Sequence, residues 1–163
     1  MARTEVERSV QPSLLDRLTD TEVGRPADAP GSRDQSERAF RRSVQRDVEW
    51  LLNTRRSMRR ATASQPFTHQ SVLEYGLLDT TGMSMTGEAG PAKLADHIKD
   101  TLQRYEPRLT NVVVKLLGAD EKQRLQVRFT IQATLQMDPT PEQIVFDTVL
   151  EMASGSYEVG ATD

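Results

Sequence analysis

Apolar and polar residues alternate through most of residues 123–135, the most regular stretch of the chain, with Leu125 as the first apolar position. One set of positions is apolar, and the other holds Arg, Gln and Thr side chains. Strict period 2 over this length predicts a half-buried antiparallel strand with one wet face. The apolar set is Leu125, Val127, Phe129, Ile131, Ala133 and Leu135.

Two more segments predict strands that can pair with this one. Residues 111–117 contain a β-branched apolar run, and residues 143–152 show apolar positions on one face. The connections 118–122 and 137–141 contain the Gly, Asp and Pro residues that are typical of turns. Together these segments predict an antiparallel β-meander of three or more strands.

Two helical patterns precede the strands. The first covers residues 38–53, and the second covers about 91–105. Between them, residues 71–77 predict a single helical turn ended by Gly76, a residue suited to the left-handed cap conformation. The expected fold class is therefore α+β, with two main helices packed on the meander.

The ends of the chain differ in composition from its middle. Residues 1–37 predict a flexible N-terminal arm, because Gly, Pro and charged residues dominate residues 19–37. The arm contains a short apolar segment at 12–18, which either docks on a partner or folds back on its own domain. Residues 38–152 predict the folded domain, and residues 153–163 predict a disordered tail.

One carboxylate breaks the apolar stripe of the first helix. The helical angle of Asp47 places it among Phe40, Val44, Val48 and Leu51. A carboxylate in that position needs a charged or hydrogen-bonding partner. We expect an arginine or the N–H groups of a nearby turn to supply one.

A rigid charged corner separates the second helix from the first strand. Pro107 disfavours the helical conformation for Glu106, so the helix should end near Tyr105. Glu106 and Arg108 then flank a ring that leaves the backbone little freedom. We interpret Glu106, Pro107 and Arg108 as a docking element for a partner.

Composition excludes several classes of function. The chain has no cysteine, which removes disulfides, thiolate zinc sites and thiol nucleophiles. It has no run of 18 apolar residues, and its first residues lack the apolar stretch of a secretory signal. These features favour a cytoplasmic protein that does not insert into a membrane.

Enzymatic and nucleic-acid-binding functions are weaker alternatives. His69 and His97 are isolated from any ligand pattern, and no phosphate loop or recognisable carboxylate pair is present. We therefore expect no catalytic residue, metal or cofactor, although a cell-wall glycosidase is one alternative. Nine arginines within residues 33–60 suggest a second alternative, an arginine-rich nucleic-acid-binding adaptor. An aromatic content of 5% and a net charge of −3 argue against nucleic acid as the partner.

Four segments, in order, resemble the TssE family of type VI secretion baseplate wedge subunits and the related phage baseplate wedge proteins. They are residues 12–18, 43–56, 71–77 and 106–109, which read PSLLDRL, SVQRDVEWLLNTRR, SVLEYGL and EPRL. The departure from the family pattern lies at Leu77-Leu78-Asp79, where relatives often have a proline before the aspartate.

The resemblance implies a structural role without catalysis. It implies a baseplate component on the cytoplasmic side of the inner membrane, bound to the wedge subunits TssF and TssG. Glu106, Pro107 and Arg108 match the motif that contacts the wedge core. The resemblance also implies a platform for the contractile sheath proteins TssB and TssC, which an edge of the sheet would serve by accepting a strand.

Overall fold

A computed structural model of the chain describes residues 10, 13–19, 33–57, 67–68, 71–79, 89–119, 126–138 and 140–162. The chain divides into two compact units, Met1–Val44 and Gln45–Asp163. Helix α2 (Arg33–Asn53) contributes residues to both units. The second unit contains the sheet and most of the side chains discussed below.

The first unit contains α1 (Leu14–Leu18), a single short helix. Ser13 caps it by accepting a hydrogen bond from the backbone N–H of Asp16. None of its residues is buried, and its three leucines are exposed. The expected apolar segment is therefore a helix, and its role in docking stays a prediction.

Helix α2 begins five residues before the predicted helix, so the flexible arm was predicted to extend too far. Asp34 lies in the first turn, where a negative charge interacts favourably with the helix dipole and stabilises the helix. Arg33 and Glu37 form an i,i+4 ion pair with an N–O distance of 2.8 Å. These local charges extend the helix beyond the apolar stripe on which the prediction rested.

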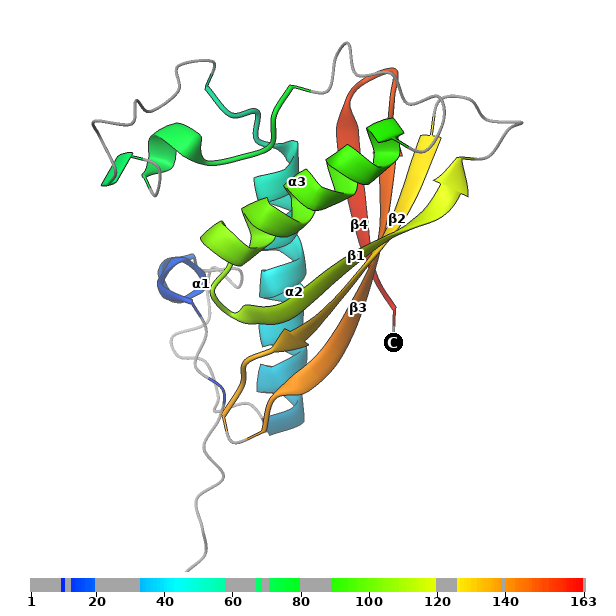
Figure 1. Ribbon diagram of the computed structural model, residues 1–163. Helices are drawn as coiled ribbons and strands as arrows, with labels where there is room; N and C mark the ends of the chain where they lie inside the picture. Colours follow the sequence, from blue (N-terminus) through cyan, green and yellow to red (C-terminus); the bar gives the residue numbers. More distant parts are fainter. Residues whose placement is uncertain are drawn as a thin grey trace, which may run out of the picture. The chain divides into compact units, whose positions relative to one another are not determined.

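The second unit is built on a four-stranded antiparallel sheet (Figure 1). Its strands are β1 (Leu109–Ala119), β2 (Gln126–Leu135), β3 (Glu142–Glu151) and β4 (Ser156–Thr162). They pair in the order β1-β2-β3-β4, which is a meander. The α+β fold class with a meander of three or more strands is confirmed.

Residues 153–163 were predicted to be a disordered tail, but Ser156–Thr162 form strand β4. Gly155 has a φ of +68°, and its N–H donates to the carbonyl of Glu151 at 2.8 Å. This tight turn folds the chain back on β3, and Tyr157 and Val159 become buried. The prediction was wrong because the apolar positions that mark this strand, Tyr157, Val159 and Ala161, alternate over only a short segment.

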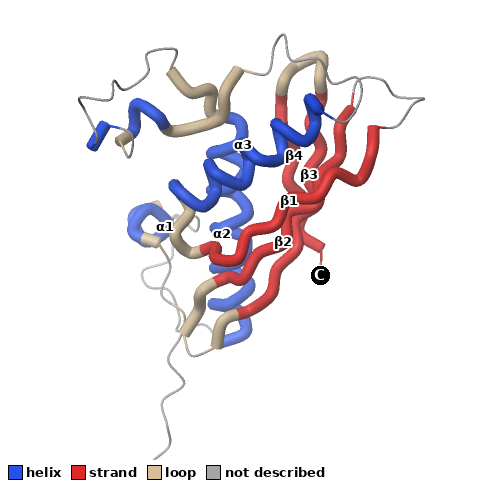
Figure 2. The backbone as a smooth tube through the Cα atoms, viewed as in Figure 1, coloured by secondary structure: helices blue, strands red, loops and turns tan. Residues whose placement is uncertain are grey.

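One face of the sheet carries the apolar core of the second unit. Helix α3 (Ala89–Tyr105) packs against β1, and α2 lies beside β4 through hydrogen bonds from Gln45 and Asn53 (Figure 2). The alternating residues of β2 that the sequence placed in the core are buried where the structure describes them. They are Val127, Phe129, Ile131, Ala133 and Leu135.

The opposite face of β2 is less exposed to solvent than its polar sequence suggests. Arg128 is exposed, but Thr130 and Thr134 are buried. The hydroxyl of Thr130 donates to Asp147 at 3.2 Å, and Gln143 donates to the hydroxyl of Thr134 at 2.8 Å. Cross-strand polar side chains therefore cover the threonines.

The segment 71–79 contains η2 (Val72–Glu74), a single 3-10 turn where the sequence predicted one helical turn. Gly76 follows with a φ of +98°, which confirms its left-handed conformation. The next residue, Leu77, pairs with the end of α2: its N–H donates to Thr54, and its carbonyl accepts from Arg56, both at 2.8 Å. These bonds fix the segment against the end of α2.

Candidate partner-binding site

The corner between α3 and β1 is held by backbone hydrogen bonds on both sides of Pro107. The N–H of Glu106 donates to Leu102 at 2.9 Å, and the N–H of Leu109 donates to Glu106 at 3.0 Å. Pro107 itself is exposed. As predicted, α3 ends at Tyr105, and the chain turns directly into β1.

The two charged residues of the corner pair with each other. Arg108 donates from Nε and Nη2 to the two carboxylate oxygens of Glu106, each at 2.6 Å. Only 5% of Glu106 is exposed. Glu106 therefore points to Arg108 in this structure, and the exposed part of the corner is Pro107 with part of Arg108.

Arg108 also reaches a second carboxylate. Its Nη2 donates to Oδ2 of Asp47 at 2.7 Å, and Arg46 donates to Oδ1 of Asp47 at 2.9 Å. This confirms that Asp47 has arginine partners. Sequence alone did not say which ones, because Arg108 lies 61 residues away along the chain.

An aromatic residue continues this network to the surface. The guanidinium of Arg46 lies 4.8 Å from the ring centroid of Trp50, within the range of a cation–π contact. The Trp50 side chain is on the next turn of α2 and is 52% exposed. Glu106, Arg108, Asp47, Arg46 and Trp50 thus form one connected series of contacts, which we call the corner network.

The carboxylates of the network affect the pKa values of two neighbouring groups, Arg108 and Tyr75. Hydrogen bonding to Glu106, opposed by burial and assisted by Asp47, raises the pKa of Arg108 above its ordinary high value. Burial, followed by the charges of Asp47 and Glu106, raises the pKa of Tyr75. Arg108 is therefore a permanent cation, and Tyr75 is a neutral phenol near both carboxylates.

Two tyrosines pack together beside the corner. The rings of Tyr75 and Tyr105 meet edge to face, with centroids 5.3 Å apart and an angle of 71° between planes. The hydroxyl of Tyr105 donates to the carbonyl of Ser71 at 3.3 Å. The segment 71–77 therefore supports the end of α3 from which the corner begins.

The two edges of the sheet differ in how their backbone groups are covered. On β4, Asn53 both donates to the carbonyl of Tyr157 at 2.8 Å and accepts from its N–H at 2.9 Å. Gln45 donates to the carbonyl of Val159 at 2.7 Å. Side chains of α2 therefore occupy the outer edge of β4.

Strand β1 forms the other edge. Within the described residues, no hydrogen bond reaches its outer side between Val112 and Leu117. Three apolar side chains of this strand, Val113, Leu116 and Leu117, are exposed. β1 is thus the edge that can still pair with another strand.

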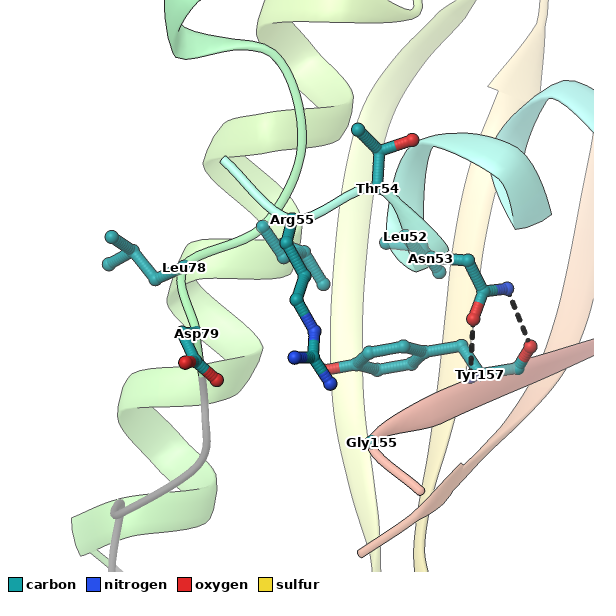
Figure 3. Close-up of a pocket in the computed structure, with 9 residues that line it drawn as sticks. Leu52, Asn53, Thr54, Arg55, Leu78, Asp79, Gly155 and Tyr157 are labelled. Atoms are coloured by element: carbon teal, nitrogen blue, oxygen red, sulfur yellow. Dashed lines mark hydrogen bonds between the residues drawn. The ribbon is translucent and has the colours of Figure 1, made fainter. Parts of the chain in front are cut away.

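A small pocket lies where α2, β4 and the segment after η2 meet (Figure 3). Its volume is about 10 Å³, which is room for about one water molecule. Arg55 and Tyr157 are among the residues that line the pocket, as Figure 3 shows. Among the residues that the structure describes, the buried hydroxyl of Tyr157 has no hydrogen-bond partner, and burial raises the pKa of Tyr157. The pocket is too small for an organic substrate.

Of the other histidines and arginines noted in the sequence, only some lie within the described residues. His97 is half-buried on α3, and His69, Arg59 and Arg60 lie outside the described residues. Among the residues that the structure describes, no three His, Asp or Glu side chains gather as a metal site would require. In the same residues, no helix combines the length and the apolar character needed to cross a bilayer.

Comparison with known proteins gives the family. The family model described as baseplate wedge protein gp25 matches residues 38–140, which is more than half of the chain. The chain belongs to this family. No curated protein matches the sequence. Family membership gives a structural role in a phage-tail-like baseplate, and TssE belongs to the same family.

Sequence reasoning missed several contacts at this site. The contact between Trp50 and Arg46 was not predicted. The hydrogen bonds of Asn53 and Gln45 to β4 were not predicted either. An i,i+4 spacing on one helix could have suggested the Arg46–Trp50 contact, whereas no local signal marks the bonds to β4.

Proposed function

We propose that this protein is a structural component of a type VI secretion baseplate and works by binding, without catalysis. The observation that carries the proposal is the corner network within a chain of the baseplate wedge family. A buried carboxylate and a permanent cation are fixed on a rigid turn, with Pro107 exposed beside them. This arrangement suits recognition by a protein surface.

The proposed contact joins the corner to the wedge subunits TssF and TssG. Glu106 holds the Arg108 guanidinium by two hydrogen bonds, so Arg108 is presented in a fixed orientation. A preorganised guanidinium loses less conformational entropy when it binds a carboxylate. Glu106 then acts through Arg108, while Pro107 and Arg108 face the partner.

We expect Arg108→Ala to weaken binding to a purified TssF–TssG complex by about 30-fold or more, since truncating one partner of a buried charge pair costs about 2–5 kcal/mol. Arg108→Lys keeps the charge but loses the two-point geometry, and should also bind more weakly. Isothermal titration calorimetry measures both effects, and protein secretion should fall in parallel.

The matched control is Lys99→Ala, which removes one exposed cation from α3, away from the corner. It should bind as the unmodified protein does. Circular dichroism distinguishes lost binding from lost folding. Normal affinity and normal secretion in a folded Arg108→Ala variant would refute the contact.

The second part of the proposal concerns the sheath proteins TssB and TssC. We propose that an extended segment of a sheath protein pairs with β1, because β1 is the uncovered edge and carries exposed apolar side chains. The pairing register gives the direction of its backbone groups. The backbone N–H and carbonyl of Tyr157 point away from β3, since both are bonded to Asn53. The alternation of bonded groups across the antiparallel ladders then places the outward N–H groups of β1 at Val114 and Leu116.

We therefore expect Leu116→Pro to block sheath assembly, because proline removes an outward donor without removing a bond to β2. Fluorescently tagged sheath in cells reports assembly, and thermal unfolding reports the fold. Ala161→Pro is the matched control, since it removes an outward donor from β4, whose edge α2 already covers. Sheath assembly at the normal frequency with a folded Leu116→Pro variant would rule out β1 as the acceptor.

A further inference from the structure

Arg108 donates to two carboxylates, one close to it along the chain and one far from it. Glu106 is two residues away and moves with the same turn. Asp47 is 61 residues away on α2 and accepts from Nη2 at 2.7 Å. The bonds to Glu106 fix the guanidinium relative to the corner, while the bond to Asp47 fixes it relative to α2.

Asp47 is itself held in a defined orientation. Arg46 donates to its Oδ1 from Nη2 at 2.9 Å and from Nε at 3.2 Å, while Oδ2 accepts from Arg108. Both carboxylate oxygens are engaged, so rotation about the side-chain bonds would break one contact or the other. Arg46 is in turn placed over the ring of Trp50.

The charge balance shows that Asp47 is not needed to neutralise Arg108. Arg108 and Glu106 already form a neutral pair with two hydrogen bonds. Adding Asp47 brings a second negative charge, which Arg46 balances. Partly buried ion pairs of this kind add little net stability, because removing the charges from water offsets their attraction. Asp47 instead fixes the orientation of the Arg108 guanidinium relative to α2.

We propose that Asp47 is a positioning residue of the partner-binding site, which sets the orientation in which Arg108 meets the partner. The proposal rests on the proposed function, since it assumes that Arg108 contacts another protein. It assigns to α2 a part in recognition that the corner motif alone does not contain. The partner's matching group is a carboxylate or a carbonyl that accepts from a guanidinium.

The test uses the full-length chain and the purified TssF–TssG complex. Asp47→Asn keeps the shape of the side chain and removes its charge. We expect it to weaken binding about tenfold or more, with a change in melting temperature of less than about 4 °C. Asp47→Glu, which restores the carboxylate, should recover most of the affinity.

Two further variants separate positioning from general structure. Glu49→Gln removes one negative charge from the same helix two residues away, and it should bind normally. In an Arg108→Ala background, Asp47→Asn should have no additional effect on binding, because its action passes through Arg108. A merely structural role predicts the same loss of affinity in both backgrounds, and that result would overturn the proposal.

Three other outcomes of these measurements also test the positioning role of Asp47. If Asp47→Asn lowers the folded fraction, affinity is calculated per folded molecule, and a normal value then overturns the proposal. If Arg108→Ala weakens binding but folded Asp47→Asn binds normally, only the positioning role fails. If Arg108→Ala itself binds normally, the proposed contact fails, and the positioning role fails with it.

Discussion

Replacing Gly76 with alanine should destabilise the protein by about 3–5 kcal/mol, a large part of the stability of an ordinary domain. Gly76 has a φ of +98°, which an L side chain adopts only with strain of about 1–3 kcal/mol. A Cβ at this position would lie 2.2 Å from the carbonyl oxygen of Thr54. That oxygen belongs to the backbone and cannot rotate away.

Relief of the clash would separate the segment after η2 from the end of α2. The hydrogen bonds that join Leu77 to Thr54 and to Arg56 would lengthen or break, each at a cost of about 0.5–1.5 kcal/mol. Leu77 is buried, so its packing would suffer as well. Urea unfolding followed by circular dichroism measures the total change.

The chain supplies matched controls for this prediction. Gly155 also has a positive φ, of +68°, but a Cβ there would approach only the end of the Arg55 side chain, at 3.3 Å. Gly155→Ala should therefore cost about 1–2 kcal/mol, the conformational part alone. Gly160→Ala meets only an ordinary contact at 3.6 Å and should cost still less. Equal losses for Gly76→Ala and Gly155→Ala would show that the Thr54 contact does not matter.

The elements that the sequence predicted well are those with long periodic patterns. Strand β2 and helix α3 repeat their apolar positions often enough to leave one interpretation. Pro107 marks the end of α3 because its ring restricts Glu106, a local steric effect. Gly76 was likewise identified from its own properties, since few other residues adopt a left-handed conformation.

The features that the sequence did not predict depend on residues far apart in the chain. Strand β4 is short, and the bonds between its backbone and Asn53 span 104 residues. For Asp47, an arginine or the backbone N–H groups of a nearby turn were predicted as the partner, and Arg108 was not singled out, because many arginines could have filled this role. Local patterns specify secondary structure, whereas the choice of partner depends on how the sheet and helices pack.

The same limit applies to the ion pair between Arg56 and Glu74. Both residues lie outside long helices, in segments without a period, and no sequence pattern pairs them. In the structure, Nη1 of Arg56 lies 2.8 Å from Oε2 of Glu74, and the side chains are 16% and 6% exposed. The pair joins the end of α2 to η2, directly before Tyr75 and its contact with Tyr105.

Removing either member of this pair should destabilise the protein strongly. Glu74→Ala leaves the Arg56 cation buried without its counter-charge, and such a loss typically costs about 3–5 kcal/mol. Arg56→Met should cost a similar amount, because it leaves the Glu74 carboxylate buried. The double variant, Arg56→Met with Glu74→Leu, should lose less than the sum of the single losses, since it leaves no buried charge.

A thermodynamic cycle from urea unfolding of the two single variants and the double variant measures this coupling. The Arg33–Glu37 pair is the matched control, because it has the same 2.8 Å distance but greater exposure, 27% and 24%. Its cycle should give no more than about 0.5 kcal/mol, the usual value for an i,i+4 pair on a helix surface. Additive losses at Arg56 and Glu74 would mean that burial does not strengthen their interaction. The support that η2 gives to the corner would then rest on the Tyr75–Tyr105 contact and the Leu77 backbone bonds instead.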